Sequence, residues 1–269
     1  MTTGSGGTMA TGGMGATGPV APACAQLPGC DDFENYTSGQ RPAGEWTGFE
    51  VDGGSLAVDG TRGFGASRKS IKISVNAGDG GRKARMQHKG TGLLPADVVF
   101  MRMMFWMEGA TPRGEGHWNW IWGDGDLSLK SGGLMNNASI ATGGFLGSDN
   151  TFLLYTGAKQ ASFVDCFSPS STKIPVGRWA CLEFELNSTT NSVRSWIDGK
   201  LDLAASVEQG IPISGMCVAG HNPPGLWLVP RPQRVFFGWT MFHSVGAPAT
   251  AWLDDIAMAT TRIGCPATP

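Results

Sequence analysis

The chain has 269 residues, of which 41% are hydrophobic, so it is long enough to bury a substantial core in one large β domain or two small ones. Twenty Lys and Arg residues stand against 22 Asp and Glu residues, which gives a formal net charge of -2 and no polybasic run of the kind that follows a phosphate backbone. No apolar run reaches about 18 residues. We therefore expect neither a nucleic acid partner nor a membrane span.

Residues 1–25 consist largely of Gly, Thr, Ala and Met and carry no charge. Such a composition buries too little apolar surface to offset the entropy of the chain. We predict a flexible tether over 1–25, followed by a single domain over 26–269. A tether on an exported chain whose signal peptide has been removed fits a secreted or cell-surface protein, and a plain disordered tail fits the same residues.

Six cysteines follow the start of the tether, and none of them forms a CxxC pair. Only four His residues accompany them, so a zinc site has little support. An even number of cysteines favours disulfides and an oxidising compartment, with reduced buried thiols as the alternative. The pairing that we expect is Cys24 with Cys30, Cys166 with Cys217, and Cys181 with Cys265.

Short runs with a period of two, broken by 41 glycines and 16 prolines, fill the rest of the chain. They predict strands near 31–35, 55–59, 69–75, 82–89, 97–108, 117–123, 133–140, 151–156, 178–187, 191–197, 233–243 and 251–260. No helix of ordinary length is expected. Many short strands favour an all-β fold, a jelly-roll β-sandwich of the concanavalin-like kind with two antiparallel sheets and a concave face.

Three predicted strands suggest which side chains the sandwich displays. In 97–108, one face is wholly apolar, while the other mixes aromatic residues with Arg102 and Glu108 and so touches water or a ligand. In "HWNWIW", Trp118, Trp120 and Trp122 form one row, which places His117 and Asn119 with Ile121 on the other face. In 251–260, the adjacent Asp254 and Asp255 are expected on opposite faces.

Several stretches resemble a known family in order and spacing. They are "CDDFENY", "GASRKSIKI", "WACLEFELNSTTNSVRSWIDGKL", "VFFGWTMF" and "AWLDDIAMATTRIGC". The pattern is similar to that of the cellulose-induced secreted proteins of filamentous fungi, the Cip family, which are similar in fold to glucuronan lyases. The resemblance covers most of 30–266 and is weak from about 109 to 175.

The resemblance implies a structural calcium ion. Its ligands would be Glu34, Asp254 and the backbone carbonyls near Ala66 and Lys69. Calcium prefers hard oxygen ligands of this type, and the ion would relieve the repulsion between two carboxylates from the first and last strands. Asp255 would then point to solvent or to a nearby cation. The alternative is that both Asp residues protect an edge strand with their charge.

The related lyases cleave a uronic acid polymer by β-elimination, which requires a donor for the C6 carboxylate, a base and an acid. The resemblance implies Arg102 as the donor and His117 as the base, and it supports Tyr155 loosely as the acid. The auxiliary residues that we expect are Asn119 as a second donor and Gln87, Arg85 and Trp106 as substrate-binding residues. Each has a structural alternative: His117 as a surface residue, Arg102 in an ion pair with Glu108 or Glu115, and Tyr155 in packing.

Two other function classes remain open. The protein could be a non-catalytic, calcium-containing carbohydrate-binding module in plant cell-wall degradation, with Trp106, Trp227 or Trp239 as a sugar platform. A hydrolase with paired carboxylates is disfavoured, because Glu183 and Glu185 lie on one face of one strand and cannot flank a bond from two sides. We expect a monomer that acts on a polysaccharide, as a lyase on a glucuronan-like polymer in the first instance.

Overall fold

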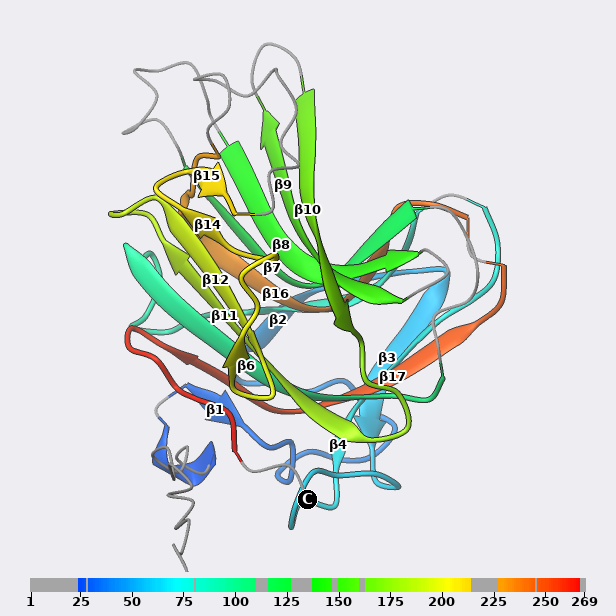
Figure 1. Ribbon diagram of the computed structural model, residues 1–269. Coiled ribbons are helices and arrows are strands. Elements are labelled where there is room, and N and C mark those ends of the chain that lie inside the picture. The colour runs from blue at the N-terminus through cyan, green and yellow to red at the C-terminus, as the bar shows by residue number, and fades with distance from the viewer. Residues whose placement is uncertain are drawn as a thin grey trace, which may run out of the picture.

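A computed structural model describes residues 24–27, 29–79, 81–109, 116–126, 137–146, 150–159, 163–213, 227–244 and 246–266. The tether predicted over 1–25 lies almost wholly outside these residues. The described elements are one short 3-10 helix and a series of antiparallel strands (Figure 1). The elements are η1 (Cys24–Gln26), β1 (Cys30–Asp31), β2 (Trp46–Asp52), β3 (Gly54–Asp59), β4 (Ser70–Val75), β5 (Arg82–His88), β6 (Val98–Met107), β7 (Gly116–Asp126), β8 (Asn137–Leu146), β9 (Thr151–Lys159), β10 (Phe163–Lys173), β11 (Trp179–Asn187), β12 (Ser192–Ile197), β13 (Lys200–Leu201), β14 (Val207–Glu208), β15 (Ile211–Pro212), β16 (Arg231–Met241) and β17 (Ala249–Ala259).

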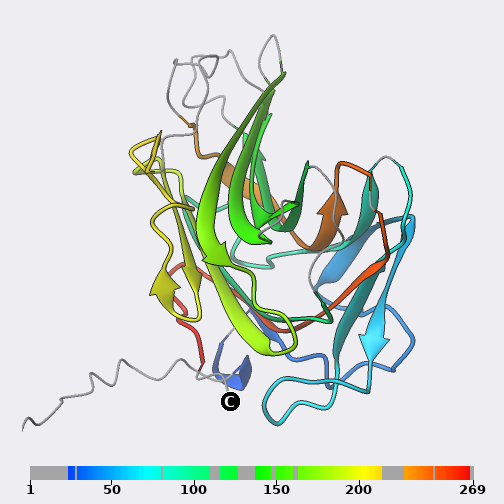
Figure 2. The ribbon, with the colours of Figure 1, turned by 45° about the vertical axis from the view of Figure 1, so that its right-hand side comes forward.

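The strands form two antiparallel sheets, which confirms the predicted jelly-roll sandwich. The ten-stranded sheet runs in the order β15, β14, β12, β11, β6, β17, β4, β3, with β1 on β17 and β13 on β12. The seven-stranded sheet runs in the order β10, β9, β8, β7, β16, β5, β2. Figure 2 shows the strong curvature of the green strands of this second sheet. Among the described residues, no helix is long and apolar enough to cross a membrane.

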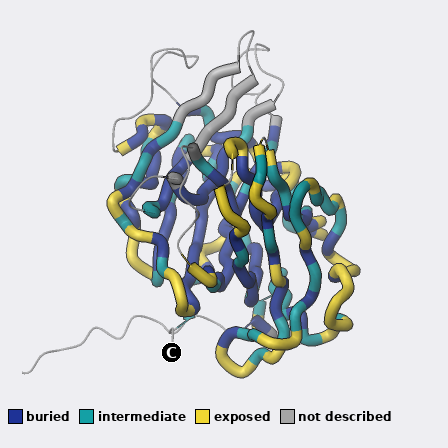
Figure 3. Tube along the Cα trace, turned by 90° about the vertical axis from the view of Figure 1, so that its right-hand side faces the viewer, coloured by how far each residue is buried: buried dark blue, intermediate teal, exposed yellow. Residues whose placement is uncertain are grey.

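The core lies between the two sheets, and Figure 3 shows buried residues along the strands with exposed ones gathered in the loops. Strand β6 confirms the predicted alternation, because its odd-numbered residues from Val99 to Met107 all belong to this core. Strand β16 contributes every second residue from Val235 to Met241. The side chains between these positions are left for the outward faces of the sandwich.

The two-residue strands β13, β14 and β15 fall outside the predicted ranges, and so do two long strands, which both carry residues that hide the period of two. Strand β2 shifts register against β5 between Thr47 and Glu50, at a bulge that contains Gly48. Strand β10 contains Pro169, which cannot donate to a ladder and is tolerated because β10 is the edge of its sheet. The predicted strand at 31–35 is reduced to β1. The one predicted at 133–140 overlaps β8 over 137–140, and 133–136 lie outside the described residues.

The two ends of the domain meet on the ten-stranded sheet. Strand β1 pairs with β17, and two predicted disulfides are confirmed, Cys24–Cys30 and Cys181–Cys265. The second disulfide fastens the chain after β17 to strand β11. The side chains of the third expected pair, Cys166 and Cys217, lie outside what the structure describes.

Candidate functional site

One transverse row of residues crosses the seven-stranded sheet. Gln87 of β5 pairs with Phe236 of β16, which in turn pairs with Trp122 of β7. Trp122 pairs with Ala141 of β8, and Ala141 pairs with Tyr155 of β9. Residues that pair directly across antiparallel strands share a face of the sheet. The row therefore marks one surface, the outward face of the seven-stranded sheet.

A bulge in β7 brings Trp122 to this surface. The register between β7 and β8 shifts between Asn119 and Ile121, so Trp118, Trp120 and Ile121 all enter the core. Trp122 then points away from the core, with His117 and Asn119. The expectation that Trp122 lies in one row with Trp118 and Trp120 is wrong, because the extra residue reverses the alternation beyond it.

Side-chain contacts between rings and a guanidinium form a continuous series across this face. The ring of His117 lies 5.0 Å from that of Phe242, and Phe242 lies 5.9 Å from Trp122. The guanidinium of Arg85 stacks over Trp122 at 5.3 Å and over Phe236 at 4.3 Å. His243 adds a second imidazole 5.2 Å from His117. We call this surface the sheet-face site; its residues are Arg85, Gln87, His117, Asn119, Trp122, Phe236, Phe242 and His243.

Arg85 is oriented by an ion pair with Glu50 of β2. Its Nη2 donates to Glu50 Oε2 at 2.8 Å and its Nε donates at 3.1 Å. Burial alone would raise the pKa of Glu50, but the charges and hydrogen bonds of Arg85 and Lys83 together outweigh it and lower that pKa, so the pair stays charged. The Nη1 group of Arg85 is buried and has no hydrogen-bond partner among the described residues. A cationic donor with spare capacity is what a carboxylate ligand needs.

Asn119 is the most unusual polar residue of the face. It is only 2% exposed, and neither its amide nitrogen nor its amide oxygen has a partner within the described part of the chain. A buried amide that stays unpaired costs about 1–3 kcal/mol, so its retention calls for a function. Gln87 sits beside the site at Gly48, where a Cβ atom would lie 3.0 Å from that of Gln87. Gly48, with a φ of 50°, thus leaves room for the glutamine.

The strand register places Tyr155 in the same row as Gln87 and Trp122. Its side chain lies outside what the structure describes. Strand β9 therefore supplies the position of the expected acid, at two strands' distance from Trp122.

Arg102 and Trp106 are placed elsewhere. Both lie on β6 of the ten-stranded sheet, on the face that points away from the core. Arg102 is fully buried, and its Nη1 donates to the carbonyl of Gly264 at 3.3 Å. Trp106 is covered by the guanidinium of Arg62 at 4.2 Å. The structure therefore does not bring the predicted donor Arg102 together with the predicted base His117, since a fully buried side chain on the other sheet cannot reach the same sugar.

One further expectation is corrected by burial. Trp227 and Trp239 are fully buried in the main core and cannot form a sugar platform. Glu183 accepts backbone N–H groups of Ile263 and Gly264 at 2.8 and 2.9 Å, so it anchors the C-terminal segment. Glu185 forms an ion pair with Arg194 at 3.3 Å, so both carboxylates have structural partners.

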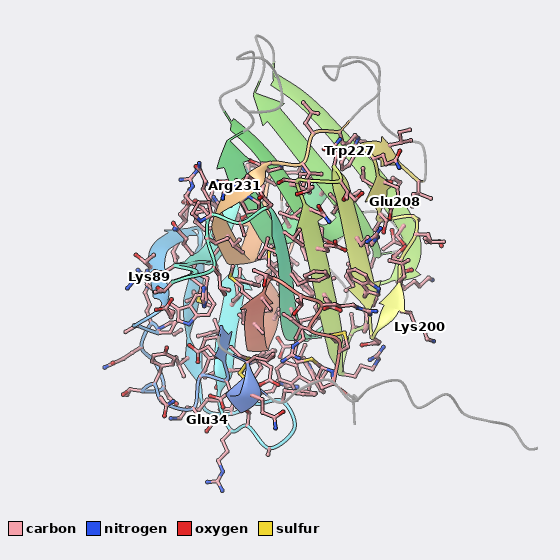
Figure 4. The ribbon with its side chains drawn as sticks, turned by 90° about the vertical axis from the view of Figure 1, so that its left-hand side faces the viewer. Glu34, Lys89, Lys200, Glu208, Trp227 and Arg231 are labelled. Carbon is pink, nitrogen blue, oxygen red and sulfur yellow. A yellow bond between two sulfur atoms is a disulfide. The ribbon has the colours of Figure 1, made fainter. Side chains whose placement is uncertain are left out.

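The expected calcium ligands meet around one short loop. Glu34 Oε1 accepts the N–H groups of Arg68 and Lys69 at 2.6 and 2.7 Å, while Asp254 Oδ2 accepts that of Phe64 at 2.7 Å. Two carboxylates from opposite ends of the chain thus hold both ends of the loop that contains Ala66. Figure 4 shows Glu34 at the lower end of the molecule.

The carboxylates of Glu34 and Asp254 meet only some of the requirements of a cation site. Burial raises the pKa of Asp254 to about 8, which is the situation of a buried carboxylate that lacks a positive partner. However, no group of three or more His, Cys, Asp or Glu side chains suited to a metal occurs among the described residues. The ammonium of Lys69 also binds the carbonyls of Glu34 and Tyr36, at 2.7 and 2.8 Å. Carbonyl ligands would have to complete such a site.

Asp254 and Asp255 do not lie on opposite faces as expected. Leu253 and Ile256 both enter the core although they are three residues apart, and the register of β17 on β6 shifts between Asp254 and Ala257. Asp255 adopts a positive φ of 43° at this bulge. Both carboxylates therefore leave the core side, and Asp255 faces the charge of Arg102.

The fold and this surface define a class, the jelly-roll sandwiches to which several polysaccharide lyases belong. A solved alginate lyase of family PL-14 from Aplysia kurodai is similar over 77% of this chain and 87% of its own, with 10% identity and a TM-score of 0.50. The alginate lyase vAL-1 from Chlorella virus is similar over 80% and 92%, with 9% identity and a TM-score of 0.51. At this identity the likeness concerns the fold.

The family is shown by sequence. The family model described as the Cip1-like core domain of polysaccharide lyase-like proteins matches residues 32–261. The chain therefore belongs to the Cip1-like family. A solved structure of the cellulose induced protein Cip1 is similar over 88% of this chain and 99% of its own, with 21% identity and a TM-score of 0.58. No curated protein matches the sequence significantly.

Sequence reasoning missed Trp122, Phe236, Phe242 and His243 as members of the site. The stretch "VFFGWTMFH" carried a signal for Phe236 and Phe242, because both occupy the even positions opposite the core residues of β16. Trp122 had no such signal, since its face depends on a bulge.

Proposed function

We propose that the protein is a polysaccharide lyase that cleaves a uronic acid polymer of the glucuronan type at the sheet-face site. The observation that carries the proposal is the contact chain from His117 through Phe242 and Trp122 to Arg85. It unites an imidazole, a cationic donor and aromatic rings for sugar stacking on one open sheet face. Membership of the Cip1-like family supports a carbohydrate as the partner.

In the proposed mechanism, Arg85 replaces Arg102 as the donor to the C6 carboxylate. Its unpaired Nη1, with Asn119 and Gln87, stabilises the negative charge that develops on that carboxylate. His117 takes the C5 proton, and the electron pair of the C–H bond forms the C4–C5 double bond as the C4–O bond breaks. Tyr155 gives its proton to the leaving oxygen. The products are a new chain end and an unsaturated uronic acid residue, with no oxidant or water consumed.

A carbohydrate-binding module remains the second candidate. The aromatic side chains favour it, because Trp122 and Phe242 lie next to each other and are suited to stack on sugar rings whether or not a bond is cleaved. Binding without catalysis requires the rings and Arg85 but not His117.

We also propose that a structural calcium ion is held by Glu34 and Asp254, with backbone carbonyls near Ala66 and Lys69. The loop that both carboxylates clasp supports this assignment. The ion would fix this loop to the ends of the chain. The two confirmed disulfides are compatible with secretion, which we propose as the location of the protein.

The decisive experiment is an assay of the full chain with glucuronan, alginate and polygalacturonate. The unsaturated product absorbs near 235 nm, and a lyase raises this absorbance with at least one polymer. No rise with any of the three, together with saturable binding to one of them, would replace the lyase by the binding module. If the protein neither cleaves nor binds any of the three polymers, both candidates are refuted.

A further inference from the structure

A cavity of about 540 Å³ lies at the edge of the sandwich, where the chain after β1 meets the ends of β2 and β5. Its polar lining comes from Asp31, Asn35, Tyr36, Glu45, His88 and Thr91. Figure 4 labels Glu34 and Lys89, the neighbours of Asn35 and His88, on this side of the molecule. The volume is within the roughly 300–1,000 Å³ of ligand sites. We call it the edge pocket.

His88 supplies a buried donor to this pocket. The residue is 3% exposed, and its ring meets that of Trp46 edge to face at 4.9 Å. Its Nδ1 accepts the N–H of Gly90 at 2.9 Å, so the proton of the neutral ring is on Nε2. No hydrogen bond to Nε2 occurs within the described residues. Burial lowers the pKa of His88 and keeps the ring neutral. A fixed N–H donor in a cavity wall invites an acceptor from a ligand.

The acceptors of the pocket are held in place as firmly as this donor. Asp31 Oδ2 accepts the hydroxyl of Tyr36 and the indole N–H of Trp46, both at 2.7 Å. Glu45 accepts the hydroxyl of Thr91 at 3.0 Å, and this bond lowers the pKa of Glu45. Rigid carboxylates that retain lone pairs are good acceptors for hydroxyl groups.

The charge of the edge pocket is opposite to that of the sheet-face site. Asp31 and Glu45 line it, and no Lys or Arg is among its lining residues. Lys89 lies next to it, where its ammonium binds the carbonyl of Gly44 at 2.5 Å. Gln87 and His88 are neighbours on β5, so the alternation of the strand turns them to opposite faces. The two sites are therefore separate.

We propose that the edge pocket binds a neutral sugar unit, apart from any uronic acid polymer at the sheet-face site. A neutral sugar offers hydroxyl donors to Glu45 and Asp31 and hydroxyl acceptors to His88 Nε2 and the amide of Asn35. The ring of Tyr36 gives an apolar wall for the C–H groups of the sugar. A uronate is disfavoured, because its carboxylate would face two fixed negative charges. The inference does not depend on lyase activity.

The test is a titration of the full chain with cellotriose, xylotriose and mannotriose, and with a triuronate for comparison. The His88 imidazole resonances in ¹H–¹⁵N spectra report on the pocket itself. We expect at least one neutral trisaccharide to shift them saturably, with a dissociation constant in roughly the millimolar range. The triuronate should leave them unchanged at the same concentration.

Variants at the rim separate this pocket from other surfaces. Glu45→Gln and Asn35→Ala should each weaken binding by about fivefold or more, because the first replaces a charged acceptor by a neutral amide and the second removes one hydrogen-bond partner from the sugar. Asp52→Asn, at the far end of β2, is the matched control and should leave it unchanged. The proposal is overturned if no neutral sugar shifts His88, if both rim variants bind normally, or if the triuronate binds equally well. Because the readout is His88, a failed lyase assay has no bearing on the outcome.

Discussion

The two outward faces of the sandwich carry similar residue types and use them differently. On the ten-stranded sheet, Glu183 of β11 pairs directly with Arg102 of β6, and both side chains are fully buried. The chain after β17 covers them: Glu183 accepts the N–H groups of Ile263 and Gly264, and Arg102 donates to the carbonyl of Gly264. These charges bind backbone of the same chain and stabilise the fold.

On the seven-stranded sheet, contacts within the chain orient the polar groups but do not satisfy all of their hydrogen-bonding atoms. Arg85 is fixed by Glu50. Within the described ranges, its Nη1 and both amide atoms of Asn119 have no hydrogen-bond partner. The contrast teaches that an arginine in a strand indicates a ligand site only when some of its N–H donors have no hydrogen-bond partner within the folded chain. The predictions below test whether this distinction separates function from stability.

The largest effect should follow the loss of the base. His117→Ala should lower the rate of polymer cleavage by about 10²–10⁴-fold, the usual contribution of a general base, while the melting temperature changes little. Initial rates at 235 nm measure the effect. Arg102→Met gives the opposite pattern if the two faces differ as described, with reduced stability and an unchanged kcat for the folded fraction. A fully active His117→Ala variant would remove His117 from the mechanism.

The second effect concerns the covered face. Glu183→Ala removes one of the two carboxylates, the other being Asp255, whose charges act on the buried Arg102, and it leaves two backbone N–H groups without an acceptor. We expect a loss of about 3–5 kcal/mol in the free energy of unfolding, measured by urea denaturation. Glu208→Ala is the control, because Glu208 is 43% exposed in its ion pair with Arg194, and should cost less than about 1 kcal/mol. Equal losses in the two variants would contradict the structural role of the covered charges.

The third effect concerns the proposed calcium ion, whose ligand Asp254 lies on β17 of the ten-stranded sheet, like the covered charges. An ion that binds only the folded state at about 100 times its dissociation constant adds roughly 2.7 kcal/mol, so excess chelator should lower the melting temperature by roughly 5–10 °C. Glu34→Gln should abolish this response to calcium. An unchanged melting curve of the parent protein in chelator argues against the site.

The fold was largely predictable, because strands such as 97–108 and 233–243 alternate strictly and the alternation follows from the geometry of a strand. Bulges were not. At Trp122 and at Asp255 one extra residue reverses the alternation, and its presence depends on the register of neighbouring strands that no local pattern records.

The candidate site was predictable in part for a related reason. His117, Asn119, Arg85 and Gln87 were expected together and do share one face. Arg102, which the family resemblance implied, and Trp106 were expected with them, on a strand face that mixes charged and aromatic residues. That face is covered by Arg62 and the C-terminal segment, which lie far away in sequence, and such coverage is a property of the folded chain alone.

The smallest effect compares one aromatic residue from each outward face. Phe242 is 37% exposed and contacts His117 and Trp122, so Phe242→Ala should weaken binding of a uronic acid oligosaccharide by roughly two- to tenfold, the worth of one stacking contact. Trp106→Phe should leave this affinity unchanged, since Arg62 already occupies the face of that ring. Titration calorimetry with both variants checks this difference. If Trp106→Phe is the weaker binder, the glycan lies on the ten-stranded sheet. The distinction between side chains that are satisfied within the protein and side chains that are available to a ligand then fails.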